Sequence, residues 1–358
     1  MQIAKKYNRI SLLGFIKFFA AILIVWFHTS IFFLPEETWR FTTGRILVEL
    51  FFIITGYFTA KHFQKDEDSL KALSINEKAL SAIKYSIKKY IIFIPYILIA
   101  AIMLYLTVFI MNGNYNIRSF FDIMRSLPID LLFLNSQTAN LNWPIWFLSA
   151  SIIVMPIIAL LCQTNKPHLL YAISILILPI YYFNFFNFDV TYYPAVIRAF
   201  MGILAGVCVF GLVKWLDSIE IKKEARKSFS CFALLLLILT VFLLSGTDKF
   251  LCDKPNSQLI LILFIILLSF ALSKHSLFAR VSNRFLDFLE KLSFPIYILH
   301  VPVIFVAQAV FPNHSLWFYT IFVYSVTITL SISLYCMIEL AKIRLPSIKS
   351  LILENKEK

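Results

Sequence analysis

Polar and hydrophobic positions alternate in long blocks along this chain, and the apolar blocks are its strongest structural signal. A helix that crosses a membrane needs about 20 apolar residues, because the hydrocarbon core is about 30 Å thick and a helix rises about 1.5 Å per residue. Ten segments meet this requirement: 11–33, 44–60, 90–111, 145–163, 168–184, 194–213, 229–246, 257–273, 293–311 and 316–340. A shorter amphipathic stretch, 118–135, is expected in or near the outer membrane interface. The pattern predicts an all-α polytopic membrane protein with about ten transmembrane helices.

The Lys and Arg residues between these segments predict the orientation of the helices. If successive helices alternate in direction, both chain ends and four of the connections lie on one side of the membrane. That side carries 25 of the 33 Lys and Arg residues, and the opposite side carries six. Because positive residues favour the cytoplasmic side, both termini are predicted to be cytoplasmic.

Composition agrees with a chain that is solvated by lipid. Hydrophobic residues make up 60% of the 358 positions and charged residues 15%, with a mean hydropathy of +0.80, whereas average chains are about 25% charged. The net charge of +13 is spread over short loops. It therefore fits acidic lipid headgroups or an anionic cytosolic ligand, and it does not predict nucleic-acid binding. The five scattered Cys residues show no metal-binding or disulfide spacing, so no metal site is predicted.

One membrane domain accounts for the chain, because no segment has the length and polarity of a soluble domain. The predicted division is a membrane domain over 1–345 and a short cytoplasmic tail over 346–358. The first apolar run lacks a small-residue cleavage site, so it is expected to be a retained helix.

Six ionisable residues remain inside the predicted spans. They are Lys17, His28, Glu49, Arg198, His300 and Glu339. An ionisable group in a span costs several kcal/mol unless it is paired or hydrated, so each is a functional candidate. Snorkelling towards the interface or a purely structural ion pair is the alternative for each of them.

Helix geometry places these residues at different depths. Lys17 and His28 are eleven residues apart on one helix face, with His28 in the outer half of the membrane. Glu49 enters from the outside and is expected at the depth of His28, where a hydrogen bond would orient the imidazole. Arg198 reaches a comparable level. The inner half is expected to hold the remaining three residues: Lys17, His300 and Glu339.

These polar residues, in this order, resemble the acyltransferase-3 family of bacterial membrane acyltransferases. The resemblance rests on six pieces, which run along most of the chain. They are Lys17-x10-His28, Val48-Glu49-Leu-Phe-Phe-Ile-Ile-Thr55-Gly56-Tyr57, Trp146-Phe-Leu-Ser149, Arg198 with Gly202 and Gly206, Leu292-Ser-Phe-Pro-Ile-Tyr297-Ile-Leu-His300-Val-Pro302, and Glu339. Two positions depart from the family pattern: Ile92 replaces the second Arg of an R-x-x-R motif that begins at Lys89, and Ser151 stands where many members have Glu. The chain resembles the single-domain type, without the extracytoplasmic domain of larger members.

The resemblance implies an O-acyltransferase of the bacterial cytoplasmic membrane. Such an enzyme moves an acyl group, usually acetyl, from cytosolic acetyl-CoA to a hydroxyl of a glycan, which is a polysaccharide or a lipid-linked glycan. Acetyl-CoA is then a co-substrate, and no permanently bound cofactor is expected. The implied general base is His28. Glu49 would orient it, and Arg198 would stabilise the oxyanion or hold the acceptor.

The resemblance and the basic loops also suggest binding residues. Lys17, Lys88 and Lys89 are candidates for the polyanionic CoA. His300 and Tyr297 are expected to hydrogen-bond CoA, the acceptor or simply another helix. Trp146 is expected either to stack on a sugar or to belong to an interfacial aromatic belt. Thr55 and Ser149 suit helix packing better than nucleophilic attack.

Two other classes of protein fit a bundle of this kind. A transporter or flippase of lipid-linked glycans would also contain internal charges, although the chain shows no internal repeat. A glycan polymerase would need a large outer loop, and the longest predicted here is 112–144. The sequence does not identify the acceptor, the acyl length, the accepting membrane face or the oligomeric state. Nor does it decide between direct transfer, with His28 as base, and a covalent acyl-histidine, which is the less favoured variant.

Overall fold

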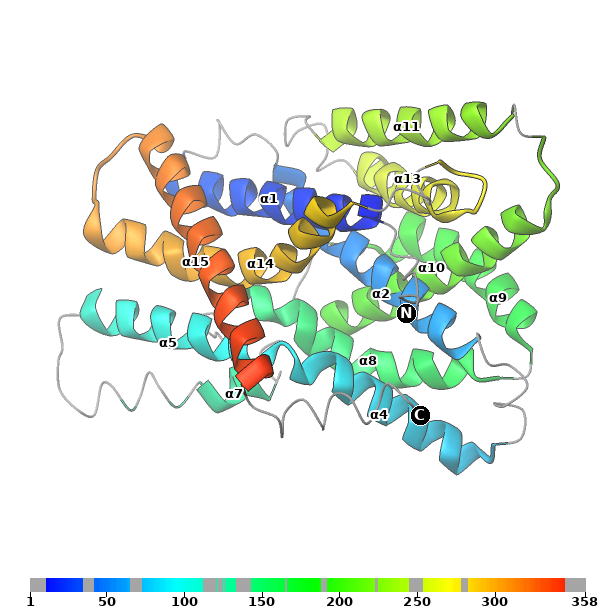
Figure 1. Cartoon of the computed structure of the whole chain (residues 1–358), viewed down its shortest axis with the longest axis horizontal. Helices are drawn as coiled ribbons and strands as arrows, with labels where there is room; N and C mark the ends of the chain where they lie inside the picture. The colour runs from blue at the N-terminus through cyan, green and yellow to red at the C-terminus, as the bar shows by residue number, and fades with distance from the viewer. Residues whose placement is uncertain are drawn as a thin grey trace, which may run out of the picture.

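The computed structural model describes residues 11–34, 42–64, 73–111, 121, 125, 127–132, 143–164, 166–187, 192–222, 225–244, 254–277 and 283–344. In this part of the chain all regular structure is helical (Figure 1). The α-helices are α1 (Ser11–Phe33), α2 (Leu47–Phe63), α4 (Ile75–Ile91), α5 (Ile94–Met111), α7 (Leu127–Leu131), α8 (Trp146–Cys162), α9 (Pro167–Ile180), α10 (Tyr192–Ser218), α11 (Ala225–Leu244), α13 (Lys254–Leu272), α14 (Arg284–Val310) and α15 (Leu316–Arg344). Short 3-10 turns precede α2 (Thr42–Ile46) and α8 (Trp143–Ile145), and a π-turn (Tyr181–Phe185) follows α9.

The apolar helices agree with the ten predicted spans. Within the described ranges, eight helices are long and apolar enough to cross a membrane, and two shorter apolar helices, Trp146–Cys162 and Ser257–Leu272, coincide with the fourth and eighth predicted spans. The protein is therefore a multi-pass membrane protein built from helices. The side of the membrane that each helix end faces stays a prediction. Most of the amphipathic stretch 118–135, and all of the tail 346–358, lie outside the described residues.

Helix α4 lies in a segment that was predicted to be an inner loop. It begins at a capping box, in which Ser74 accepts from the Glu77 amide and the Glu77 carboxylate accepts from the Ser74 amide. The Ser74 hydroxyl also donates to the Glu77 carboxylate, and this bond, together with that from the Ser74 amide, lowers the pKa of Glu77. One face of α4 packs against α8 (Figure 1). The Ser-x-x-Glu pattern is the sequence signal that identifies this helix start.

Helices α2 and α10 cross at two glycines. A Cβ atom at Gly56 would lie 1.8 Å from the carbonyl oxygen of Ile203, and one at Gly206 would lie 2.0 Å from that of Ile53. Small residues allow this close approach of two backbones, which is a common way to associate helices in membranes. The crossing fixes α2 against α10 and so decides which residues can face Glu49.

Helices α1 and α14 pack side by side and run in the same direction. Lys17 contacts Glu290, and further along both helices His28 contacts His300. Helix α14 begins at Arg284, where the Asn283 side chain caps it. This start is earlier than the predicted span 293–311, and it brings the acidic residue Glu290 onto the helix.

Candidate functional site

The centre of the site is a pair of buried histidines. His28 comes from α1 and His300 from α14, and their side chains are joined by a hydrogen bond of 2.6 Å between His28 Nδ1 and His300 Nε2. The ring planes are 9° from parallel and the centroids are 4.8 Å apart, so the two rings meet edge to edge through the bonded nitrogens. One of the bonded nitrogens donates and the other accepts, so each ring fixes the tautomer of the other.

The position of His300 corrects the prediction that it lies in the inner half of the membrane with Lys17. His28 is 17 residues after the start of α1 and His300 is 16 residues after the start of α14. At 1.5 Å per residue these distances are about 26 Å and about 24 Å, so the two histidines share one level. The prediction was wrong because it began the helix too late and placed His300 too near its start.

Glu49 and Arg198 form a second buried pair, between α2 and α10. Glu49 Oε1 accepts from Arg198 Nε at 2.9 Å and lies 2.8 Å from Nη2. The two side chains are 0% and 2% exposed. The predicted hydrogen bond from Glu49 to His28 is therefore wrong, because α2 packs mainly on α10 and the carboxylate faces the guanidinium. Glu49 Oε2 has no hydrogen-bond partner among the described residues.

Trp146 contacts the second pair through Arg198. The Arg198 guanidinium lies 4.7 Å from the Trp146 ring centroid, and Phe186 lies near the same guanidinium at 5.9 Å. Trp146 is 8% exposed, so the structure does not place it on an open outer rim. A cation–π contact of this kind takes up one face of the indole. Stacking of Trp146 on a sugar stays a prediction.

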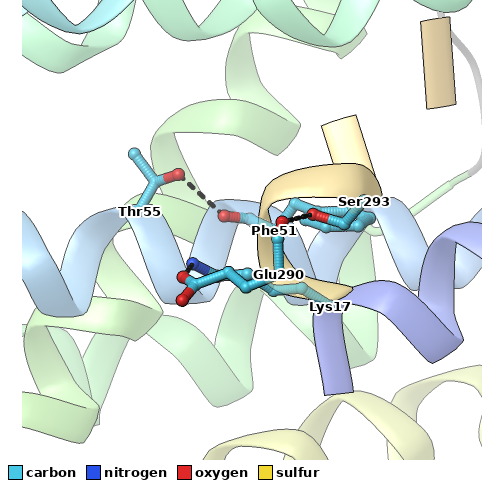
Figure 2. A network of polar contacts seen from close by, with 5 residues as sticks. All are labelled: Lys17, Phe51, Thr55, Glu290 and Ser293. Atoms are coloured by element: carbon cyan, nitrogen blue, oxygen red, sulfur yellow. Dashed lines mark hydrogen bonds and ion pairs between the residues drawn. The ribbon is translucent and has the colours of Figure 1, made fainter. Parts of the chain in front are cut away.

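A cavity of about 540 Å³ lies towards the beginning of α1, away from the histidines along that helix. Its wall includes five charged residues, namely Lys17, Lys89, Glu290, Lys291 and Glu339. Figure 2 shows how the Lys17 and Glu290 side chains meet there; Lys17 Nζ lies 2.7 Å from Glu290 Oε1. The prediction that Lys17 and Glu339 belong to one layer agrees with this wall.

Glu290, like Lys291, is a charged cavity residue that was not predicted from the sequence. It was assigned to a loop, although Asn283 followed by Asp287 is a helix-start signal that extends the ninth helix backwards. With that extension Glu290 falls six residues after the start of α14, and Lys17 six residues after the start of α1. The equal offset explains why the two side chains meet.

The two neighbouring lysines of α4 differ in their relation to the cavity. Lys89 lines the cavity, and its ammonium lies 5.4 Å from the Tyr85 ring centroid. Desolvation in this wall, and the nearby charge of Lys17, lower the pKa of Lys89. Lys88 is exposed and does not line the cavity, so the structure does not bring this predicted CoA-binding residue to it.

Tyr297 connects the cavity with the histidine pair. It lines the cavity, its ring centroid is 6.0 Å from that of His300, and its hydroxyl donates to the Pro144 carbonyl at 2.9 Å. Thr55 donates to the carbonyl of Phe51 (Figure 2). Ser149 likewise donates to the carbonyl four residues earlier, that of Ile145. Both hydroxyls thus have backbone partners.

The site combines an imidazole base with a charged cavity. The Tyr297 ring contacts both of them. A neutral imidazole with a fixed tautomer can take a proton from a hydroxyl group, which is the first step of acyl transfer to an alcohol. The three lysines of the cavity wall outnumber its two glutamates, which suits an anionic donor molecule.

Comparison with known families gives one match. The family model described as an acyltransferase domain, acyltransferase 3, matches residues 12–336, which is most of the chain. The matched range contains every residue of the histidine pair and of the buried ion pair, and Lys17, Lys89 and Glu290 of the cavity. Nothing matches among the curated proteins, and nothing among the solved structures.

Proposed function

This chain belongs to the acyltransferase-3 family and is a membrane acyltransferase, and we propose that it moves an acetyl group from acetyl-CoA to a hydroxyl of a cell-surface glycan. The observation that carries the proposal is the buried His28–His300 hydrogen bond, which lies one aromatic ring from a charged cavity. The cavity supplies a place for the donor, and the imidazole pair supplies the base.

His28 is the general base in this mechanism. When His28 Nδ1 donates to His300 Nε2, His28 Nε2 carries the lone pair that accepts the proton. The acceptor hydroxyl loses its proton to His28 as its oxygen attacks the thioester carbonyl. The tetrahedral intermediate then collapses, the carbon–sulfur bond breaks, and the CoA thiolate takes the proton from His28. Ester and free CoA are the products, and the histidine is returned to its starting state.

His300 takes the orienting role that the sequence analysis gave to Glu49. It holds His28 by a direct hydrogen bond, whereas Glu49 is bonded to Arg198. Glu49 and Arg198 are positioning residues in this proposal, because they tie α2 to α10 and place Trp146 through its contact with Arg198. An oxyanion contact from Arg198 has less support, since its guanidinium is nearly inaccessible and already paired.

The donor enters the cavity from the side on which Lys and Arg residues are concentrated. Lys17 and Lys89 are its candidate phosphate-binding groups, and the basic loops predict that this side is cytoplasmic. The acceptor reaches His28 from the other end of α1. This division keeps the polyanionic CoA and the glycan on opposite sides of the histidine pair.

The test is transfer of labelled acetyl from acetyl-CoA by the purified protein in lipid vesicles, with cell-envelope glycans as acceptors. We expect CoA release and labelled glycan with the wild type and a loss of about 10²–10⁴-fold with His28→Ala, because general-base catalysis contributes that much. His168→Ala is the matched control, because this exposed histidine lies on α9, outside the site. If the wild type neither binds nor turns over acetyl-CoA, the proposal is wrong and the membrane acyltransferase uses another acyl donor.

A further inference from the structure

Three aromatic rings meet in the cavity wall, and one of them, Tyr297, lies against His300 of the histidine pair. Phe51 of α2, Phe147 of α8 and Tyr297 of α14 all line the cavity, while His28 and His300 do not. The ring centroids are 6.1 Å apart for Phe51 and Phe147, 6.1 Å for Phe51 and Tyr297, and 6.0 Å for Phe147 and Tyr297. The planes are tilted by 54–73° to one another. We call these three residues the aromatic triad.

The triad is closed in this structure. A point equidistant from three centroids about 6 Å apart lies about 3.5 Å from each, which is already the contact distance between two carbon atoms. Tilted and edge-on packing at these separations is the favourable geometry for aromatic rings. No acyl group can therefore pass between the cavity and His28 by this path unless one of the rings moves.

Among the described residues, Phe51 is the triad ring that is held neither by a hydrogen bond nor by an aromatic ring outside the triad. Tyr297 is held by its hydrogen bond to Pro144, and Phe147 is backed by Phe52, whose ring centroid is 4.7 Å away. Phe52 in turn packs edge-on against Trp146 at 6.0 Å. The Phe51 side chain is partly exposed and packs against the hydrophobic core as well as against the two other triad rings.

The geometry points to the aromatic triad as a gate that selects short acyl groups, with Phe51 as its moving part; this inference rests on the proposed function. CoA itself stays in the cavity, so the acyl chain passes through the triad ahead of the thioester carbonyl. On the far side the chain meets buried side chains, since His28 is packed against Phe27 and followed by Thr29 and Ser30, which are 1% exposed. An acetyl group needs a small displacement of Phe51, and each added methylene needs a larger one.

The experiment compares acetyl-, butyryl- and octanoyl-CoA as donors for the wild type and for Phe51→Ala in lipid vesicles. We expect the wild type to prefer acetyl-CoA, and Phe51→Ala to raise the octanoyl-to-acetyl ratio of kcat/KM at least tenfold, because a single methylene in an apolar site already discriminates by about 10–200-fold. Phe51→Trp, which adds bulk and leaves no void, should lower transfer from butyryl-CoA more than from acetyl-CoA. Phe58→Ala is the matched control: it removes a phenylalanine from the same helix and cavity wall, away from the triad, and should leave the ratio unchanged.

The outcomes distinguish failure of the proposed gate from failure of the proposed function. If the wild type transfers acetyl while Phe51→Ala keeps the wild-type ratio, or Phe58→Ala shifts it equally, the gate is wrong and the acyltransferase mechanism stands. If no acyl-CoA is turned over by the wild type, the proposed function fails and the gate fails with it. Phe51→Leu serves as the test if the alanine variant does not fold.

Discussion

Two ion pairs among the described residues join a cation and a carboxylate in different surroundings. Lys17 and Glu290 meet at the cavity wall, with 18% and 29% of their side-chain surfaces exposed, whereas Arg198 and Glu49 are 2% and 0% exposed. A partly hydrated pair contributes about 0–1 kcal/mol and exchanges partners easily. A buried pair has no water to replace a lost partner, so breaking it costs about 3–5 kcal/mol.

The difference in exposure indicates that the two ion pairs have different roles. The pair at the cavity can release Lys17 to an anionic donor, because water and ligand reach it. The buried pair cannot take part in such an exchange, and it instead holds α2, α10 and Trp146 in place. From sequence alone, Lys17, Glu49 and Arg198 were all intramembrane charges of one kind, and burial separates their roles.

The largest effect is expected when the buried pair is broken. Glu49→Ala should lower the free energy of unfolding by about 3–5 kcal/mol, because it leaves the Arg198 guanidinium buried without its counter-charge. Thermal unfolding of the purified protein in detergent would measure the loss. The double variant Glu49→Ala/Arg198→Met should recover part of it, and a double variant no more stable than Glu49→Ala would contradict a role for the stranded charge.

The next effect concerns the histidine pair. His300→Ala should reduce kcat for acetyl transfer by about 10²-fold, because His28 loses the partner that fixes its tautomer. The KM for acetyl-CoA should stay close to that of the wild type, since the donor cavity does not include His300. Steady-state kinetics would separate the two parameters. A variant that raises KM and leaves kcat unchanged would assign His300 to donor binding instead.

A smaller effect is expected at the cavity pair. Lys17→Gln should raise the KM for acetyl-CoA by about 3–10-fold, as one charge-assisted contact to phosphate is lost. Glu290→Gln should lower the KM, because it releases Lys17 from its present partner. Neither substitution should change the free energy of unfolding by more than about 1 kcal/mol. Equal increases in KM for both variants would show that the intact pair, and not free Lys17, is what the donor needs.

The smallest effect is a pH dependence that comes from Lys89. Its pKa is lowered by desolvation and by Lys17, so its positive charge is lost at a lower pH than that of an ordinary lysine. As pH rises through this lowered pKa the positive charge disappears, and the KM for acetyl-CoA should therefore increase. Lys89→Arg should remove this increase, because arginine stays protonated up to a pH of about 12. A profile of KM against pH that is the same for both proteins would exclude Lys89 from donor binding.

The helices of this protein follow from local sequence. All ten predicted spans correspond to apolar helices, because the length of an apolar run is a property of neighbouring residues. The signals that were missed are local as well: Ser74 with Glu77 begins α4, and Asn283 begins α14 early. The short list of intramembrane ionisable residues also came from sequence, since a charge within an apolar run is visible without a structure.

The pairing of those residues was decided by tertiary structure. Glu49 joins Arg198 across 149 positions, His28 joins His300 across 272, and Lys17 joins Glu290 across 273. Each partner depends on which helices are neighbours, and that depends on features such as the glycine crossing of α2 and α10. Helix adjacency is set by packing between segments far apart in the chain, so periodicity within a single helix does not contain it. Sequence therefore determined which polar groups enter the membrane, and only the packed bundle decided which of them meet.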